Sequence, residues 1–144
     1  MASKYDKRKL QDIIRASNGQ MDQALGVVVE EMRNEIVESF GTSPAGRTYR
    51  RGRKTHTASQ AGFPPNVDTG QLKASIRARR MGGLRTLHLK YRIEDGVTWG
   101  IYMELGTPSG KIKKRPFVRP VFEAWGQGGK ALKRLRELLG EVFS

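Results

Sequence analysis

The sequence predicts an α+β fold in one domain: an antiparallel β-meander packed against a long helix in the N-terminal half and a C-terminal helix. Two kinds of pattern lead to this expectation. Apolar residues recur every three or four positions within 21–40 and again within 120–144, as on one face of an amphipathic helix. Between these regions, residues 87–93 alternate between apolar and polar side chains, which is typical of a half-buried strand. The length of 144 residues suits a single domain.

The N-terminal part is expected to contain two helical segments. Residues 1–20 form an arm or a short helix that ends at Ser17-Asn18-Gly19. The longer helix runs from Met21 to Phe40, and Gly41 stands where a left-handed C-cap belongs. The apolar stripe of this helix consists of Leu25, Val28, Met32, Ile36 and Phe40.

Residues 42–65 are expected to form a long basic loop. They are rich in Gly, Arg, Ser and Thr, and they include the run Tyr49-Arg50-Arg51-Gly52-Arg53-Lys54. A structureless loop of this length is uncommon within a compact domain and tends to be functional. Gly62-Phe63-Pro64-Pro65 closes the loop with a stiff, extended turn.

The β-meander is expected between residues 76 and 105. Its strands are predicted at Ile76–Met81, 87–93 and Trp99–Leu105, joined by turns at Gly82-Gly83 and Asp95-Gly96. The third segment is either a strand or a strand preceded by a helical turn. A separate short turn of helix, through Gln71, Leu72 and Ser75, is expected before the first strand.

The C-terminal helix is expected over residues 120–144, with Pro120 in its first turn. Gly126, Gly128 and Gly129 should break or bend it. Apolar residues between Ala131 and Val142 then form a stripe, which lies opposite Lys130, Lys133, Arg134 and Arg136.

Positive charge is concentrated in the middle third of the chain. The net charge is +13, and residues 44–92 carry 12 Lys or Arg against a single Asp. Such a surface attracts polyanions, nucleic acid above all, or it is solvated or matched to a protein partner. The chain has no cysteine and no apolar run near the ~20 residues that cross a bilayer. We therefore expect no disulfide, no membrane span and no secretory signal, and assembly in a cytoplasm.

The sequence offers no recognisable catalytic or metal site. His56 and His88 lack partners at ligand spacing, and Gly106–Lys111 misses the spacing of a phosphate-binding loop. Glu104 is the only acidic residue in 99–119, without a paired carboxylate or nucleophile. We expect Glu104 to pair with Arg115 or Arg119, or with a neighbouring subunit, and we expect no enzymatic activity and no cofactor.

Two clusters are candidates for binding. The run Tyr49–Lys54 interleaves one aromatic ring with four cations, which suits contact with the backbone of DNA or RNA, or a solvated loop that orders on a protein partner. The closely spaced aromatic residues Trp99, Tyr102 and Phe117 suit the core, and some suit a subunit interface.

Four segments, in order, resemble a family of neck and tail-completion proteins (minor tail components) of long-tailed, lambda-like bacteriophages. Val67–Ile76 resembles the family's D-T-G-x-L-x-x-S-I, and Trp99–Thr107 resembles its Y-A-x-Y-V-E-F-G-T. Arg115–Val121 resembles R-P-F-L-R-P-A, and Gly62–Pro65 resembles the end of P-G-x-P-P. The likeness covers roughly residues 47–124. The N-terminal 20 residues, the C-terminal helix and the unusually basic loop 109–114 lie outside the family pattern.

The resemblance implies a small α+β virion protein that forms a ring, commonly of six subunits, at the head–tail junction and completes the tail. Its partners would be other copies of itself, the neighbouring neck and tail-tube proteins and, without sequence specificity, the genomic DNA that passes through the ring. The candidates to face DNA are Arg50, Arg51, Arg53 and Lys54, and the alternatives, for DNA or for an adjacent ring, are Lys111, Lys113 and Lys114. The candidates for a structural corner and subunit interface are Trp99, Tyr102, Glu104, Arg115, Phe117 and Arg119.

Three other functions remain open. A tail terminator ring of the same neck region fits the likeness equally well. A nucleic-acid-binding module without sequence specificity fits the charge. An enzyme such as a nuclease would need clustered acidic residues, which the sequence does not provide.

Overall fold

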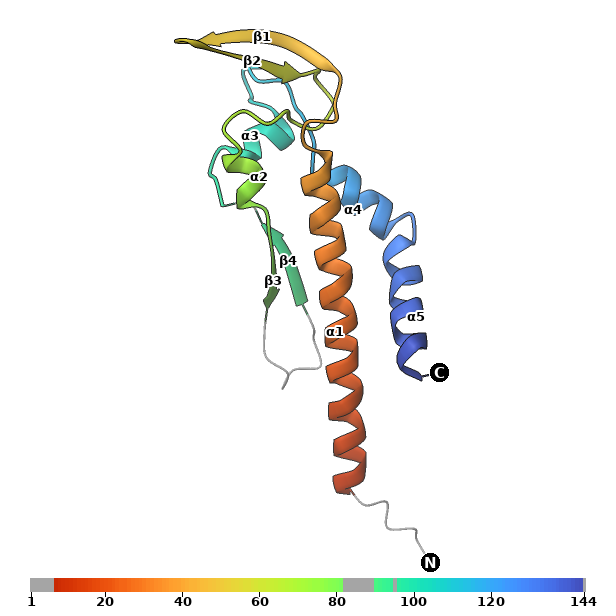
Figure 1. Ribbon diagram of the computed structural model, residues 1–144. Coiled ribbons are helices and arrows are strands. Elements are labelled where there is room, and N and C mark those ends of the chain that lie inside the picture. Colours follow the sequence, from red (N-terminus) through yellow and green to blue (C-terminus); the bar gives the residue numbers. More distant parts are fainter. Residues whose placement is uncertain (1–6, 82–89, 95, 144) are drawn as a thin grey trace, which may run out of the picture.

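The computed structural model describes residues 7–81, 90–94 and 96–143, and it confirms an α+β fold with a long N-terminal helix and a C-terminal helix. In Figure 1 the helix α1 (Lys7–Ser39) stands in the middle, with the hairpin β3–β4 on one side and α4 and α5 on the other. The short helices α2 and α3 and the hairpin β1–β2 gather at the C-terminal end of α1. In the described part of the chain, no helix has the length and apolar character to cross a membrane.

Helix α1 is one continuous helix of 33 residues, about 50 Å long. The predicted break at Ser17-Asn18-Gly19 is therefore wrong. A glycine inside a helix costs only about 1 kcal/mol relative to alanine, which is too little to end a helix whose periodic pattern continues. Gly41, by contrast, has a φ of 84° and follows the helix as the left-handed residue predicted there.

Residues 42–65 are not a structureless loop, because they contain a β-hairpin. Strands β1 (Ala45–Arg51) and β2 (Lys54–Ser59) pair antiparallel, with Arg51 opposite Lys54. The turn has Gly52 first, with a φ of 59°, as in a type II′ turn. The Thr48 and Thr57 hydroxyls lie 2.9 Å apart across the strands. The basic composition of this segment suggested a loop. Its threonine and tyrosine residues nevertheless favour strands, whatever the charge of their neighbours.

The meander is reduced to a second hairpin. Strands β3 (Arg77–Met81) and β4 (Lys90–Glu94) pair antiparallel, with Arg77 opposite Glu94, which confirms the first predicted strand and the described part of the second. The predicted turn at Gly82-Gly83, together with residues 84–89 and Asp95, lies outside the described residues. The expected third strand is wrong: Gly100–Leu105 is the helix α3. Its inward residues, Gly100 and Met103, are three apart, which is helical spacing.

The remaining helices agree with the glycine and proline signals. Helix α2 (Gln71–Ser75) is the short turn expected before β3. Helix α4 (Arg119–Gly126) has Pro120 in its first turn, and α5 (Lys130–Phe143) follows after the predicted glycine break. Gly129 has a φ of 72°, a conformation that side chains with a Cβ atom rarely adopt.

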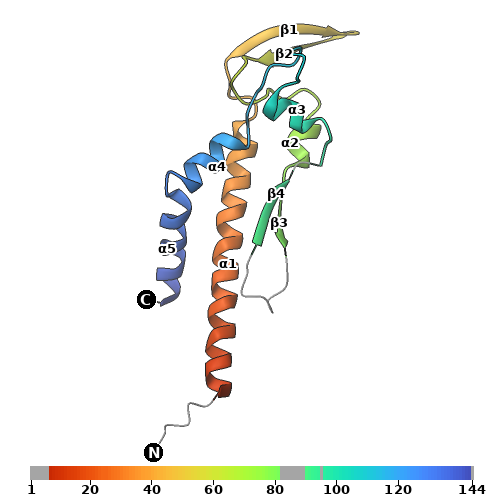
Figure 2. The same cartoon turned by 180° about the vertical axis from the view of Figure 1, so that it is seen from behind.

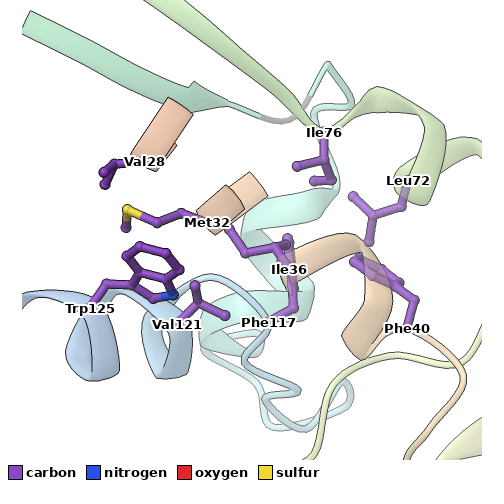
Figure 3. Close-up of a cluster of buried hydrophobic side chains, with 9 residues drawn as sticks. All are labelled: Val28, Met32, Ile36, Phe40, Leu72, Ile76, Phe117, Val121 and Trp125. Atoms are coloured by element: carbon purple, nitrogen blue, oxygen red, sulfur yellow. The ribbon is translucent and has the colours of Figure 1, made fainter. Parts of the chain in front are cut away.

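The core is small and lies around the second half of α1 (Figure 3). From α1 and the residue that follows it, the core takes Val28, Met32, Ile36 and Phe40; from the α2 region, Leu72 and Ile76; and from the α4 region, Phe117, Val121 and Trp125. The rings of Phe40 and Phe117 are 5.3 Å apart between centroids, a distance at which tilted rings attract. Segments far apart in the sequence thus meet at one end of α1, and this is where the candidate site is built.

Candidate assembly and nucleic-acid interface

Glu104 fixes the corner between α3 and α4. Its carboxylate accepts hydrogen bonds from the backbone N–H groups of Phe117 (2.8 Å), Val118 (3.1 Å) and Arg119 (2.9 Å). These donors stand at the start of α4, where a helix has no carbonyl to offer them and where its dipole favours negative charge. The expected pairing of Glu104 with the side chain of Arg115 or Arg119 is therefore wrong, although the corner is locked as predicted.

The two arginines of this segment have other partners. Arg119 Nε donates to Glu123 at 2.7 Å, and this hydrogen bond, aided by the charge of Glu104, raises the pKa of Arg119. Arg115 Nε donates to the carbonyl of Ser59 at the end of β2 (3.1 Å). The Arg115 backbone N–H donates to the carbonyl of Met103 (2.6 Å). Arg115 therefore joins the first hairpin to α3.

An exposed apolar surface lies on and beside α3. Trp99 is 39% exposed, Ile101 55%, Tyr102 48% and Leu105 65%, and we call these four residues the α3 surface. These four residues remain exposed because α3 has only six residues and its inward side is occupied by Gly100 and Met103. Phe117, which the sequence analysis grouped with Trp99 and Tyr102 as suited to the core or to an interface, is 1% exposed and belongs to the core. A contiguous set of large exposed apolar side chains marks an interaction surface.

Exposed lysines adjoin the α3 surface. Lys111, Lys113 and Lys114 are all exposed on the loop that joins α3 to α4. This loop folds back on the end of α3, because the Thr107 backbone N–H donates to the Ile112 carbonyl (3.0 Å) and the Gly62 N–H donates to the Lys114 carbonyl (2.9 Å). The reversal occurs at Gly106, with a φ of 77°, where a Cβ atom would lie 3.0 Å from the Ile112 carbonyl oxygen.

The other predicted cations stand at the far end of the β1–β2 hairpin. Arg50, Arg51, Arg53 and Lys54 are all exposed there, at the same end of the molecule as the lysine loop (Figure 2). Arg51 forms an ion pair with Asp68, whereas Arg50 donates only to the Gly52 carbonyl. The four predicted cations thus differ in their availability to a ligand, because Asp68 already counters the charge of Arg51.

The sequence analysis missed Arg47 and Asp68. The Arg47 guanidinium lies 5.5 Å from the centroid of the Tyr49 ring, on the same side of β1. Asp68 is the only acidic residue among residues 44–92, and this isolation was the one signal that it pairs with a neighbouring cation. His56 Nδ1 is 3.8 Å from Asp68, and His88 is outside the described residues. Among the residues described, no three His, Cys, Asp or Glu side chains are grouped to hold a metal ion.

A polar groove between α1 and α5 was not predicted. It encloses about 620 Å³ and is lined by Glu31, Glu35 and Trp125 with the cations of α5. Lys130 and Trp125 donate to the Glu35 carboxylate, and Arg134 donates to Glu31 at 2.9 Å. Partial burial raises the pKa of Glu35, but the hydrogen bonds from Lys130 and Trp125 outweigh burial and lower it. Ion pairs across this groove therefore hold α5 against α1.

Taken together, the geometry brings one rigid corner, one exposed apolar surface and two sets of cations to the same end of the molecule. Comparisons with protein-family models, with curated proteins and with solved structures find no match for this chain.

Proposed function

We propose that this chain is a structural virion protein of a tailed phage, which forms a ring at the head–tail junction, completes or joins the tail, and lets the genomic DNA pass. The observation that carries the proposal is how the segments of the family likeness meet. Glu104, from the second segment, binds the backbone of Phe117, Val118 and Arg119 in the third. Leu72 and Ile76, from the first segment, pack in the same core as Phe117. Three of the four short likenesses thus become one connected unit, which supports common ancestry over chance.

The exposed surfaces support an assembly role. The α3 surface and the lysine loop combine apolar side chains with a charged rim, as subunit interfaces do. The cationic hairpin is suited to contact with a polyanion such as DNA. A protein with this function works by binding and positioning, and we assign it no catalytic step.

Electron microscopy of particles from a phage with a nonsense mutation in this gene tests the proposal. We expect DNA-filled heads beside separate tails. Over-long tails would move the assignment to a tail terminator ring of the same neck region. Normal infectious particles would contradict both.

A second function is favoured by the shape of the β1–β2 hairpin: binding of nucleic acid without sequence specificity. A two-stranded β-ribbon fits the major groove of DNA, and β1 is exposed along all seven residues. If this is the primary function, the isolated monomer binds duplex DNA tightly, with an affinity that falls steeply with salt. Fluorescence anisotropy with a labelled duplex, over a range of salt concentrations, distinguishes this function from a ring that holds DNA only after assembly.

A further inference from the structure

We infer that copies of this chain join head to tail through two different surfaces: the α3 surface with its adjoining lysines on one copy, and an acidic outer face of α1 on the next. The inference rests on the proposed ring and deepens it by naming the contact between subunits. A closed ring with a heterologous interface needs two such complementary surfaces on each chain.

The outer face of α1 is a stripe of exposed residues with helical spacing: Gln23, Val27, Glu30, Asn34 and Glu38. The neighbouring faces of this helix are covered. On one side Asp22 pairs with Arg80 of β3 (2.9 Å), and on the other Glu31 pairs with Arg134 of α5. The stripe thus remains open at Gln23, Val27 and Glu30, where Val27 is 40% exposed, whereas Asn34 and Glu38 also line the groove beside α5.

Glu30 and Glu38 differ from the other carboxylates of the protein. Every other carboxylate whose side chain the structure describes forms an ion pair or accepts a hydrogen bond; these are Asp22, Glu31, Glu35, Asp68, Glu94, Glu104, Glu123 and Glu137. Glu30 and Glu38 have no such partner among the described residues, in a chain of net charge +13. Glu30 therefore leaves a negative charge on the open part of the stripe, and Glu38 lies about two helical turns farther on, at the groove that the cations of α5 also line.

The complementary surface is at the end of the molecule. Lys111 and Lys113 flank the exposed Ile112, which is 40% exposed and is hydrogen-bonded to Thr107, two residues after Leu105. This surface lies with α3 at the C-terminal end of α1 (Figure 1), whereas Val27 and Glu30 lie near the middle of that helix. A second copy can bring the two together, with apolar contact around Val27 and charge pairing at Glu30 beside it.

Charge complementarity supports a second copy as the occupant. The loop before α4 carries exposed lysines and the stripe on α1 carries exposed carboxylates, so each copy has one surface of each sign. A closed ring uses both surfaces of every copy.

Charge exchange tests the inference on the full-length chain. The measurement is the mass of the purified protein in solution, by analytical ultracentrifugation at physiological ionic strength. We expect a closed oligomer for the natural sequence and monomers for K111E/K113E and for E30K/E38K. We expect the oligomer to return when all four substitutions are combined. If a double variant were monomeric because it misfolds, combining the substitutions would not restore the oligomer. Circular dichroism checks that each variant is folded.

The matched control for K111E/K113E is R77E/R136E, which makes the same change in net charge at two exposed cations away from both surfaces. It should assemble like the natural sequence. A monomeric natural chain, unaffected assembly in either double variant, or no rescue would overturn the inference. Those results leave the proposed function standing if the nonsense mutant still yields unjoined heads and tails; normal particles from that mutant remove the proposed function itself.

Discussion

At the scale of single residues, the corner depends on one carboxylate that serves three backbone donors. Glu104 lies 13 to 15 positions before its partners, so it acts as a helix cap that no local capping pattern announces. Sequence reasoning identified Glu104 as important because it is isolated among cations. It could not identify the partners, since backbone N–H groups belong to every residue type and only the fold selects which ones a side chain reaches.

Removing this carboxylate should destabilise the protein. Glu104→Ala leaves the N–H groups of Phe117 and Val118 without an acceptor, and we expect the free energy of unfolding to fall by about 2 to 3 kcal/mol. Glu104→Gln keeps one acceptor oxygen and should cost about 1 kcal/mol. Urea denaturation measures both. Glu123→Ala, which removes an exposed ion pair with Arg119, is the control and should cost less than about 1 kcal/mol. Equal values for the two Glu104 variants would contradict the capping role.

Gly106 offers a second prediction at this scale. Both Gly106 and Gly110 have a positive φ, of 77° and 72°, but only at Gly106 would a Cβ atom meet backbone, the Ile112 carbonyl oxygen at 3.0 Å. We expect Gly110→Ala to cost about 1 kcal/mol from its backbone conformation, and Gly106→Ala to cost clearly more. Thermal unfolding of the two variants separates the steric effect from the conformational one. A lower melting temperature for Gly110→Ala than for Gly106→Ala would contradict the predicted steric effect at Gly106.

At the scale of elements, long periodic patterns were predictable and short ones were not. The helices around Met32 and Leu135 could be predicted because their apolar stripes persist over several turns. Helix α3 has only six residues, too few for periods of 2.0 and 3.6 to be told apart, and its large exposed side chains resemble a strand. The β1–β2 hairpin was missed because β1 buries nothing, so it shows no alternation between apolar and polar residues.

The hairpin provides a prediction about nucleic acid. Arg50 and Arg53 are exposed without an ion pair among the described residues, whereas Asp68 counters Arg51. We expect R50A/R53A to weaken duplex DNA binding and to reduce the slope of log K against log salt by about 2, one for each lost phosphate contact. Arg51→Ala, as the matched single variant, should change the slope by less than one. A larger effect of Arg51→Ala would show that Asp68 does not shield it.

The docking of α5 provides a prediction about pH. The pKa of Glu35 is lowered in the folded protein, since the hydrogen bonds from Lys130 and Trp125 outweigh the effect of burial. Its contribution is therefore fully present above its ordinary value of 4.5 and is lost as the pH falls through the lower folded value. We expect the environment of Trp125 to change as the pH falls through the lowered pKa of Glu35, because α5 then loosens from α1. The Trp99→Phe variant leaves Trp125 as the only tryptophan, so its fluorescence reports the change.

In the same background, Glu35→Gln should abolish this transition, because the amide does not titrate. Glu38→Gln is the control, since Glu38 lines the groove without a hydrogen bond to Trp125. A transition that persists in the Glu35 variant would assign the pH dependence to another group.

At the scale of the whole molecule, charge predicted the kind of surface but not its arrangement. The excess of arginine and lysine indicated a binding protein, and the structure divides these cations into those with partners and those without. The free carboxylates of Glu30 and Glu38 could not be found from the sequence, because their neighbours Glu31 and Glu35 look the same until α5 is placed. The distinction between two adjacent glutamates depends on which face of a helix another helix covers.

The absence of cysteine makes the head-to-tail arrangement directly testable. A chain that carries both Asn34→Cys and Ser109→Cys has one thiol in the stripe on α1 and one in the exposed loop, two residues before Lys111. Treated with a short bis-maleimide, it should give a ladder of covalent species of two, three and more subunits on denaturing gels. Chains with one of the two cysteines should give almost none. A ladder that stops at two subunits would indicate a symmetric dimer and contradict a ring.

The position of the core along α1 has a mechanical consequence. Among the residues of α1 whose burial the structure describes, the buried ones lie between Ala24 and Ile36, and the N-terminal end of the helix extends past α5 and β3–β4 (Figure 1). The part of α1 before Ala24 is about 25 Å long and rigid as a helix. A rotation of the core by about 10° would therefore carry the N-terminal end of α1 through roughly 4 Å. Helix α1 therefore acts as a lever arm. A small rotation at the Glu104 corner would produce a larger displacement at the opposite end of the molecule.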